Sequence, residues 1–261
     1  MILAATLLIA SQTLPLPSGP SKISLTLEGT TLETYVYKPH SYRGRRMICV
    51  LHGTLRNADE YRDHAIRMAE RLGALVVAPK FDAERFPNRL YHRGGVLNED
   101  GTAARRSTWT YRFIPALARE VRRIEGRPRL PYVLIGHSAG AQFLVRYAGL
   151  FDPPPGDGPE RIVAANPGSD LFPTRAMPFG YGFGNLPPEL ASDAIIRAYL
   201  GRPLTLYLGT ADDHADEDLD VSPEAMAQGL GRYQRGRAAY AFAQRVAREQ
   251  RVPFRWRVVE A

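Results

Sequence analysis

A serine between two glycines is the residue best placed in this sequence for nucleophilic chemistry. Residues 136–140 read Gly-His-Ser-Ala-Gly and directly follow a short apolar run at residues 132–135. A serine held on a sharp strand-to-helix turn exposes its hydroxyl for attack on a carbonyl carbon. Gly136 and Gly140 suit such a turn because larger neighbours would collide across it. We therefore predict Ser138 as the nucleophile of an acyl-transfer reaction; a tight turn with an incidental serine is the alternative.

Two backbone amides are candidates for the oxyanion hole that such a serine needs. A helix beginning at Ala139 points its free N–H groups, and the positive end of its dipole, at the oxygen that becomes charged. The second amide is predicted from Thr54, in the loop after the apolar run Met47–Leu51. In this interpretation His52 holds that loop by a hydrogen bond, and His137 is a packing residue of the turn.

The carboxylate that would orient a catalytic histidine is predicted at Asp212. A serine hydroxyl needs a histidine base and an acid behind it, and in this arrangement the chain order is serine, acid, histidine. Asp212 follows the apolar run Leu204–Leu208, with Asp213 as second choice. The alternative for residues 212–220 is a solvated acidic loop or a loose cation site, although the glycine and spacing of an EF-hand are absent.

The histidine base is not evident in the sequence. His214 is the one histidine after Asp212, and it lies only two residues beyond it. A base of this type follows the last strand, which we expect at residues 254–259. We therefore expect the sequence to be truncated at its C-terminus, with the base soon after Ala261, and His214 is the rival. The other histidines are expected on the surface or in loops: His40, His64 and His92.

The hydrophobic pattern predicts an α/β fold with a mainly parallel sheet and helices on both faces. Alternating residues on either side of Gly29 indicate an N-terminal antiparallel edge hairpin. Short apolar runs then alternate with longer segments of helical period, which requires right-handed crossovers between parallel strands. The expected strands are 47–51, 74–79, 132–135, 162–165, 204–208 and 254–259, and the expected helices are 59–72, 109–124, 139–150 and segments within 225–248.

Length and composition are those of one globular domain. The 261 residues contain 44% hydrophobic and 23% charged residues, so residues 21–261 are expected to form a single domain. The net charge of +7 comes from scattered arginines without the basic stripe of a nucleic-acid-binding protein. Cys49 is the single cysteine, so no intrachain disulfide is possible.

The first 20 residues are expected to be a signal peptide or a disordered leader. Residues 2–10 are apolar and are followed by small residues and prolines, which predicts a secreted or periplasmic protein. The run is too short to span a bilayer. No lysine or arginine precedes it, so an apolar tail is the alternative.

From about Met47 to Val259 the sequence resembles α/β-hydrolases of the poly(3-hydroxybutyrate) depolymerase and esterase type. The resemblance rests on Leu-His-Gly-Thr at residues 51–54, the turn at 136–140, Asn-Pro-Gly at 166–168 and Leu-Gly-Thr-Ala-Asp at 208–212. It implies ester or polyester substrates and a catalytic histidine in a loop after the final strand. This sequence departs from that pattern because it stops before such a loop.

The longest departure from the strand-helix alternation, residues 166–202, is a candidate lid or wall of an acyl pocket. It is rich in proline, glycine and aromatic residues, of which Phe172, Phe179 and Tyr181 are candidate pocket residues; plain core packing is the alternative. Trp109 is a further candidate at the border of the site. We expect an acyl hydrolase that needs no metal or cofactor, with an amidase or peptidase and a non-catalytic binding protein as alternatives.

Overall fold

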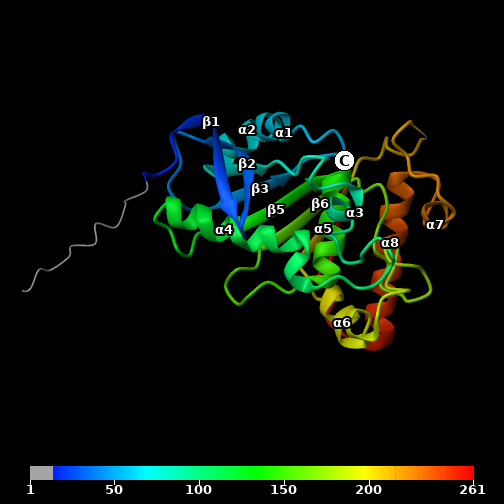
Figure 1. Cartoon of the computed structure of the whole chain (residues 1–261). Coiled ribbons are helices and arrows are strands. Elements are labelled where there is room, and N and C mark those ends of the chain that lie inside the picture. The colour runs from blue at the N-terminus through cyan, green and yellow to red at the C-terminus, as the bar shows by residue number, and fades with distance from the viewer. Residues whose placement is uncertain (1–13, 215) are drawn as a thin grey trace, which may run out of the picture.

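One eight-stranded sheet organises the molecule (Figure 1). The structure is a computed structural model and describes residues 14–214 and 216–261. The strand order is β1-β2-β4-β3-β5-β6-β7-β8, with β1 and β2 antiparallel to their neighbours and every other pair parallel. The strands are β1 (Gly19–Leu27), β2 (Thr30–Lys38), β3 (Met47–Leu51), β4 (Leu75–Pro79), β5 (Tyr132–His137), β6 (Arg161–Ala165), β7 (Leu204–Leu208) and β8 (Arg257–Glu260). The predicted α/β class and edge hairpin are confirmed.

Alternate residues of β3 and β4 enter two separate cores. Ile48 and Val76 join a small cluster under α1 (Ala58–His64) and α2 (Ile66–Leu72). Cys49 and Val77 point into the large cluster on the other face. That cluster includes residues of α4 (Phe113–Ile124), α5 (Ala139–Leu150), α6 (Asp193–Leu200) and α8 (Arg232–Gln250). Figure 1 shows α1 and α2 on one side of the sheet, with α4 and α5 on the other.

The register of the parallel strands brings their carboxyl ends to one edge. Leu51 of β3 lies opposite Gly136, His137 opposite Ala165, and Ala165 opposite Tyr207. The loops that follow β3, β5, β6 and β7 therefore leave the sheet at neighbouring positions. Ligands of parallel α/β sheets bind at this edge, so the fold brings the predicted site segments together.

Several predicted helices differ from the structure in their bounds. The expected helix 59–72 is two helices that meet at Ala65, and the expected helix 109–124 begins only at Phe113, after two 3-10 turns. Residues 225–248 are divided between α7 (Pro223–Met226) and α8, with Gly229 at φ 153° between them. The last strand begins at Arg257 rather than at residue 254.

Two helices were not predicted. A short helix, α3 (Asn88–Tyr91), lies in the loop after β4, and α6 lies within the excursion at residues 166–202. The N-cap of α6 is Ser192, whose hydroxyl accepts a hydrogen bond from Ile195 N at 3.4 Å. A serine ahead of Asp193 is a sequence signal for a helix start. The helix was not predicted because the surrounding segment is rich in proline and glycine, which are typical of loops.

The chain packs on the domain ahead of the expected boundary at residue 21. Leu16 is buried, and its amide donates a hydrogen bond to Glu125 Oε1 at 3.0 Å. The strand β1 begins at Gly19. The apolar run 2–10 of the predicted signal peptide lies outside the described residues. Within the described residues, none of the helices has the length and apolar composition needed to cross a bilayer.

Candidate active site

Ser138 occupies a strained turn between β5 and α5. Its φ is 52° and its ψ −113°, a conformation that a residue with a Cβ rarely adopts. A Cβ added to Gly136 would lie 2.4 Å from the carbonyl oxygen of Gly140, and one added to Gly140 would lie 2.5 Å from that of Leu51. The geometry is that predicted for a serine presented at an elbow, since both glycines are required by close backbone contacts.

The loop after β3 lies directly against this elbow. A Cβ placed on Gly53 would be only 3.9 Å from the Cβ of Ser138. Thr54, the next residue, is exposed, whereas Ala139 is buried at the first position of α5. The first amides of a helix have no intrahelical acceptor, so the N–H of Ala139 is available to an oxyanion. The two predicted oxyanion donors, Thr54 and Ala139, thus come from segments that lie side by side.

His52 fixes this loop from inside the core. Its Nε2 accepts a hydrogen bond from the amide of Phe81 at 3.0 Å, so the proton resides on Nδ1, which donates to Gly53 O at 3.0 Å. Burial lowers the pKa of His52 to about 4, in keeping with a neutral ring. Tyr91 adds a hydrogen bond from its hydroxyl to His52 O at 2.7 Å. His52 therefore holds the loop, as the sequence suggested.

Arg56 anchors the far end of the same loop. It has φ 61° and is buried, with its guanidinium 4.3 Å from the centroid of the Tyr91 ring. It donates to Phe81 O at 3.0 Å and to Asn88 Oδ1 at 3.2 Å. The loop that carries Thr54 is consequently fixed on both sides of Thr54.

Ser138, Asp212 and His214 border one pocket of about 440 Å³. The register of β5, β6 and β7 explains this, because the loops after these strands emerge side by side. The remaining residues of its wall are His137, Asn166, Gly209, Ala211, Asp216, Asp218 and Arg232. A second pocket of about 710 Å³ includes Thr54 and shares Asp218 with the first. The structure thus brings the predicted nucleophile, acid and oxyanion loop to one region.

Arg232 is the partner of Asp212. Its guanidinium contacts Asp212 Oδ1 at 3.0 Å and both carboxylate oxygens of Asp216 at 2.6 and 2.7 Å. This arginine, at the start of α8, is 8% exposed and lowers the pKa of Asp216 to about 2. Arg232 could not be predicted from the sequence, because nothing in its local pattern marks it as a partner of a residue 20 positions earlier.

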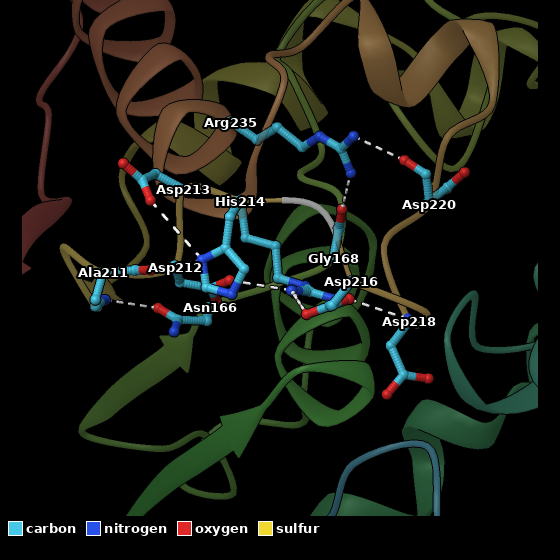
Figure 2. A network of polar contacts seen from close by, with 12 residues as sticks. Asn166, Gly168, Ala211, Asp212, Asp213, His214, Asp216, Asp218, Asp220 and Arg235 are labelled. Atoms are coloured by element: carbon cyan, nitrogen blue, oxygen red, sulfur yellow. Dashed lines mark hydrogen bonds and ion pairs between the residues drawn. The ribbon is translucent and has the colours of Figure 1, made fainter.

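Further polar contacts hold the ends of this loop, which we call the acid loop (residues 209–214 and 216–220; Figure 2). Gly209 N donates to Asn166 Oδ1 at 2.8 Å, and Asn166 has φ 44° at the end of β6. The fully buried Arg235 bridges Gly168 O and Asp220 O, both at 2.7 Å. These contacts tie the acid loop to the segment after β6.

His214 points its ring into the acid loop itself. Its Nδ1 lies 3.0 Å from Ala211 O and 3.8 Å from Asp213 Oδ1, and its side chain is 70% exposed. Figure 2 shows the ring beside Asp213. Over residues 14–214 and 216–261, no histidine ring is hydrogen-bonded to Ser138 or Asp212. His40 and His64 are exposed, whereas His92 is half-buried in the wall of the larger pocket, with a buried Nε2.

Two of the four candidate aromatic pocket residues serve the core. Trp109 has no exposed surface and therefore does not border the site, and Phe172 packs on Phe242 with ring centroids 5.3 Å apart. Phe179 lines the larger pocket. Tyr181 donates to Asp220 Oδ2 at 2.8 Å and so fastens the acid loop. Core packing, the alternative for residues 166–202, thus accounts for Phe172.

A loose cation site is the alternative predicted for residues 212–220. Among the residues that the structure describes, no group of three or more histidine, cysteine or acidic side chains is arranged to hold a metal ion. Asp212 and Asp216 instead turn their carboxylates to Arg232.

A mainly parallel sheet with a strained serine between β5 and α5 defines an α/β-hydrolase. No protein-family model matches the sequence, and no curated protein does. Among solved structures, poly(aspartic acid) hydrolase-1 from Sphingomonas sp. KT-1 superposes with a TM-score of 0.87 at 34% identity, covering 94% of this chain and 92% of that one. The poly(3-hydroxybutyrate) depolymerase LpqC from Bordetella parapertussis gives 0.84 at 30% identity, over 94% and 84%. The chain belongs to this depolymerase and esterase group of α/β-hydrolases.

More distant structures share the fold alone. The S-formylglutathione hydrolase FrmB from Staphylococcus aureus has a TM-score of 0.51 at 15% identity, over 95% of this chain and 90% of that one. The matches at 34% and 30% identity confirm, at the level of the family, the resemblance expected from residues 51–54, 136–140, 166–168 and 208–212. The chain is a hydrolase by membership of that family.

Proposed function

We propose that this chain is a serine-dependent acyl hydrolase of carboxylesterase or polyester depolymerase type. The observation that carries the proposal is the strained Ser138 at the elbow, 3.9 Å from the Cβ position of Gly53 and in one pocket with Asp212. A strained serine beside two segments with free amides matches the geometry of nucleophilic acyl transfer. Family membership supports the same reaction class.

The proposed reaction proceeds through an acyl-enzyme. Ser138 Oγ bonds to the carbonyl carbon while its proton passes to an imidazole oriented by Asp212. The amides of Thr54 and Ala139 hold the oxyanion. The alcohol then leaves with that proton, and a water molecule attacks the acyl-enzyme, so that the acid is released and Ser138 recovers its hydrogen.

Covalent labelling tests the nucleophile directly. A fluorophosphonate probe is expected to modify the chain at Ser138, located by mass spectrometry of the digested protein. Ser138→Ala is expected to abolish labelling, and Ser24→Ala, at an exposed serine of β1, to leave it unchanged. Labelling that persists in Ser138→Ala would remove the proposal.

His214 is tested as the base by His214→Gln. Two histidines of the described residues, His137 and His214, line the pocket with Ser138. Of these, His214 follows Asp212 in the chain, as the order serine, acid, histidine requires. Loss of labelling in this variant, with unchanged thermal stability, would assign the proton transfer to His214. Undiminished labelling would exclude His214 as the base. The proton acceptor would then have to be a different imidazole.

Amide hydrolysis by the same residues is the second candidate. The observation in its favour is the 34% identity to a hydrolase named for poly(aspartic acid), a polymer whose units are joined by amide bonds. Matched ester and amide substrates with one acyl group separate the two functions. Turnover of the amide at a rate comparable to the ester would favour the amidase.

A binding protein without turnover is the third candidate. It is supported by Asp212 being paired with Arg232 and by the lack of a histidine contact at Ser138 in the described part of the chain. A substrate ester that binds, while neither it nor the fluorophosphonate reacts, would favour this function.

A further inference from the structure

Tyr61 joins the two segments that would form the oxyanion hole. It lies on α1, outside every motif that the sequence analysis used. Its hydroxyl is 2.9 Å from Nδ1 of His137, the residue immediately before Ser138. The side chain is only half-buried, so apolar packing alone does not account for its position.

The same hydroxyl lies over Gly53 in the loop after β3. A Cβ built on Gly53 would be 2.6 Å from the Tyr61 hydroxyl oxygen and 3.5 Å from the ring carbon that bears it. Burial raises the pKa of Tyr61, and hydrogen bonding with the Gly53 backbone acts to lower it. One phenol oxygen therefore meets both the loop that carries Thr54 and the elbow that carries Ser138.

This position bears on catalysis because the two oxyanion amides come from different elements. Strand pairing fixes β3 against β5 as far as Leu51 and Gly136. Beyond those residues the loop leaves the sheet, and the spacing between the amides of Thr54 and Ala139 depends on contacts outside the ladder. Donors must lie within about 0.5 Å of their productive positions to stabilise an oxyanion fully, so a direct link across the gap is valuable.

We infer that Tyr61 is a positioning residue that holds residues 52–54 against the elbow and so sets the distance between the two oxyanion amides. The inference deepens the proposed function and rests on it. The tyrosine itself touches neither the substrate nor Ser138 Oγ in this account. It acts through Gly53 on one side and His137 on the other, and its loss should affect the rate of acylation more than the binding of the probe.

The test is Tyr61→Phe, which removes only the hydroxyl. Tyr37→Phe is the matched control, because Tyr37 donates to Glu70 on the protein surface, away from both pockets. The rate constant for fluorophosphonate labelling at saturation is expected to fall about tenfold in Tyr61→Phe, with unchanged probe affinity. Tyr37→Phe should label as the wild type does. A wild-type labelling rate in Tyr61→Phe would overturn the inference.

Hydrogen-deuterium exchange separates failure of this inference from failure of the proposed function. If the wild type does not react with the probe, the hydrolase proposal fails. The positioning role of Tyr61 is then tested by the exchange rates of the amides of residues 52–57. Faster exchange there in Tyr61→Phe than in Tyr37→Phe would support the positioning role, and equal exchange would refute it. Gly53→Ala, whose new Cβ would displace the Tyr61 hydroxyl, should change the exchange in the same direction.

Discussion

The two halves of the candidate site are built in different ways. The nucleophile half, made of the loop after β3 and the elbow, is continuous with the core: His52 has no exposed surface, and Ala139 is 1% exposed. The acid half is a surface loop, in which the Asp212 side chain is 20% exposed and that of His214 is 70% exposed. Close backbone contacts and the buried side chains of His52 and Arg56 hold the first half. Ion pairs of Arg232 with Asp212 and Asp216, together with Arg235, hold the second.

This difference predicts that the nucleophile half keeps fixed distances between its atoms, whereas the acid half tolerates adjustment. The nucleophile half cannot shift without opening close backbone contacts, which suits the fixed distances of an oxyanion hole. In the acid half the side chains of Asp212 and Asp216 are 20% and 40% exposed, so their pairing with Arg232 contributes less to stability than a fully buried contact. We therefore expect substitutions in the nucleophile half to affect folding and rate together, and substitutions in the acid half to affect mainly the rate.

Asp212→Asn is expected to have the largest effect. If Asp212 orients the base, its amide would favour the wrong tautomer and lower ester turnover by roughly 10⁴-fold. Asp213→Asn is the matched control, because Asp213 is 61% exposed and its ion pair is with His214 at 3.8 Å. Steady-state hydrolysis of an activated ester measures both. Similar losses in the two variants would show that Asp212 has no special role.

Gly140→Ala should break the nucleophile half. Its Cβ would lie 2.5 Å from Leu51 O and 2.8 Å from His52 O, so the elbow and the loop after β3 must separate. We expect labelling of Ser138 to slow by about 100-fold and the free energy of unfolding to fall by about 1–3 kcal/mol. Gly201→Ala is the control, since its Cβ would meet nothing closer than 3.4 Å. Unaltered labelling in Gly140→Ala would contradict the close contact.

Acid should lower the free energy of unfolding through His52. The pKa of His52 is lowered to about 4 by burial, while in the unfolded chain it is about 6.5. Between these values the unfolded state binds more protons, so stability is complete above pH 6.5 and falls as the pH drops toward 4. The loss from His52 is roughly 3 kcal/mol.

Urea unfolding between pH 7 and 4.5 measures this dependence. His92, whose pKa is lowered to about 3 by burial, adds to it in the same direction. His52→Gln should flatten the pH dependence, because a glutamine amide does not titrate in this range. An equally steep decline in His52→Gln would show that His52 is not its source.

Arg232→Met should have the smallest effect on stability. It removes the buried partner of Asp212 and Asp216, whose side chains are 20% and 40% exposed and can turn to water, so the free energy of unfolding should fall by only about 1 kcal/mol. Exchange of the acid-loop amides should nevertheless accelerate. Arg237→Met, which removes an exposed pair with Glu260, is the control and should leave the acid loop unchanged. A loop equally protected in both variants would show that Arg232 does not hold it.

The parts of the site that follow from local pattern were predictable. Gly136, Ser138 and Gly140 are adjacent in the chain, and their types alone require a sharp turn after an apolar strand. The strand Leu204–Leu208 likewise placed Asp212 at the carboxyl end of the sheet. Local pattern was insufficient for Trp109, because an aromatic residue next to a loop is compatible with a pocket wall as well as with the full burial that the structure shows.

The sequence by itself determined the α/β alternation and the sharp turn at Ser138, because each depends on residues within one turn or strand of one another. Only the tertiary structure decided that Arg232 pairs with Asp212, that Tyr61 reaches His137, and that the amide of Phe81 bonds to a buried, neutral His52 ring. Those contacts join residues 20, 76 and 29 positions apart. The packing of whole elements brings such residues together, and burial then sets their charge. Local spacing in the sequence therefore predicts neither the contacts nor the charge states.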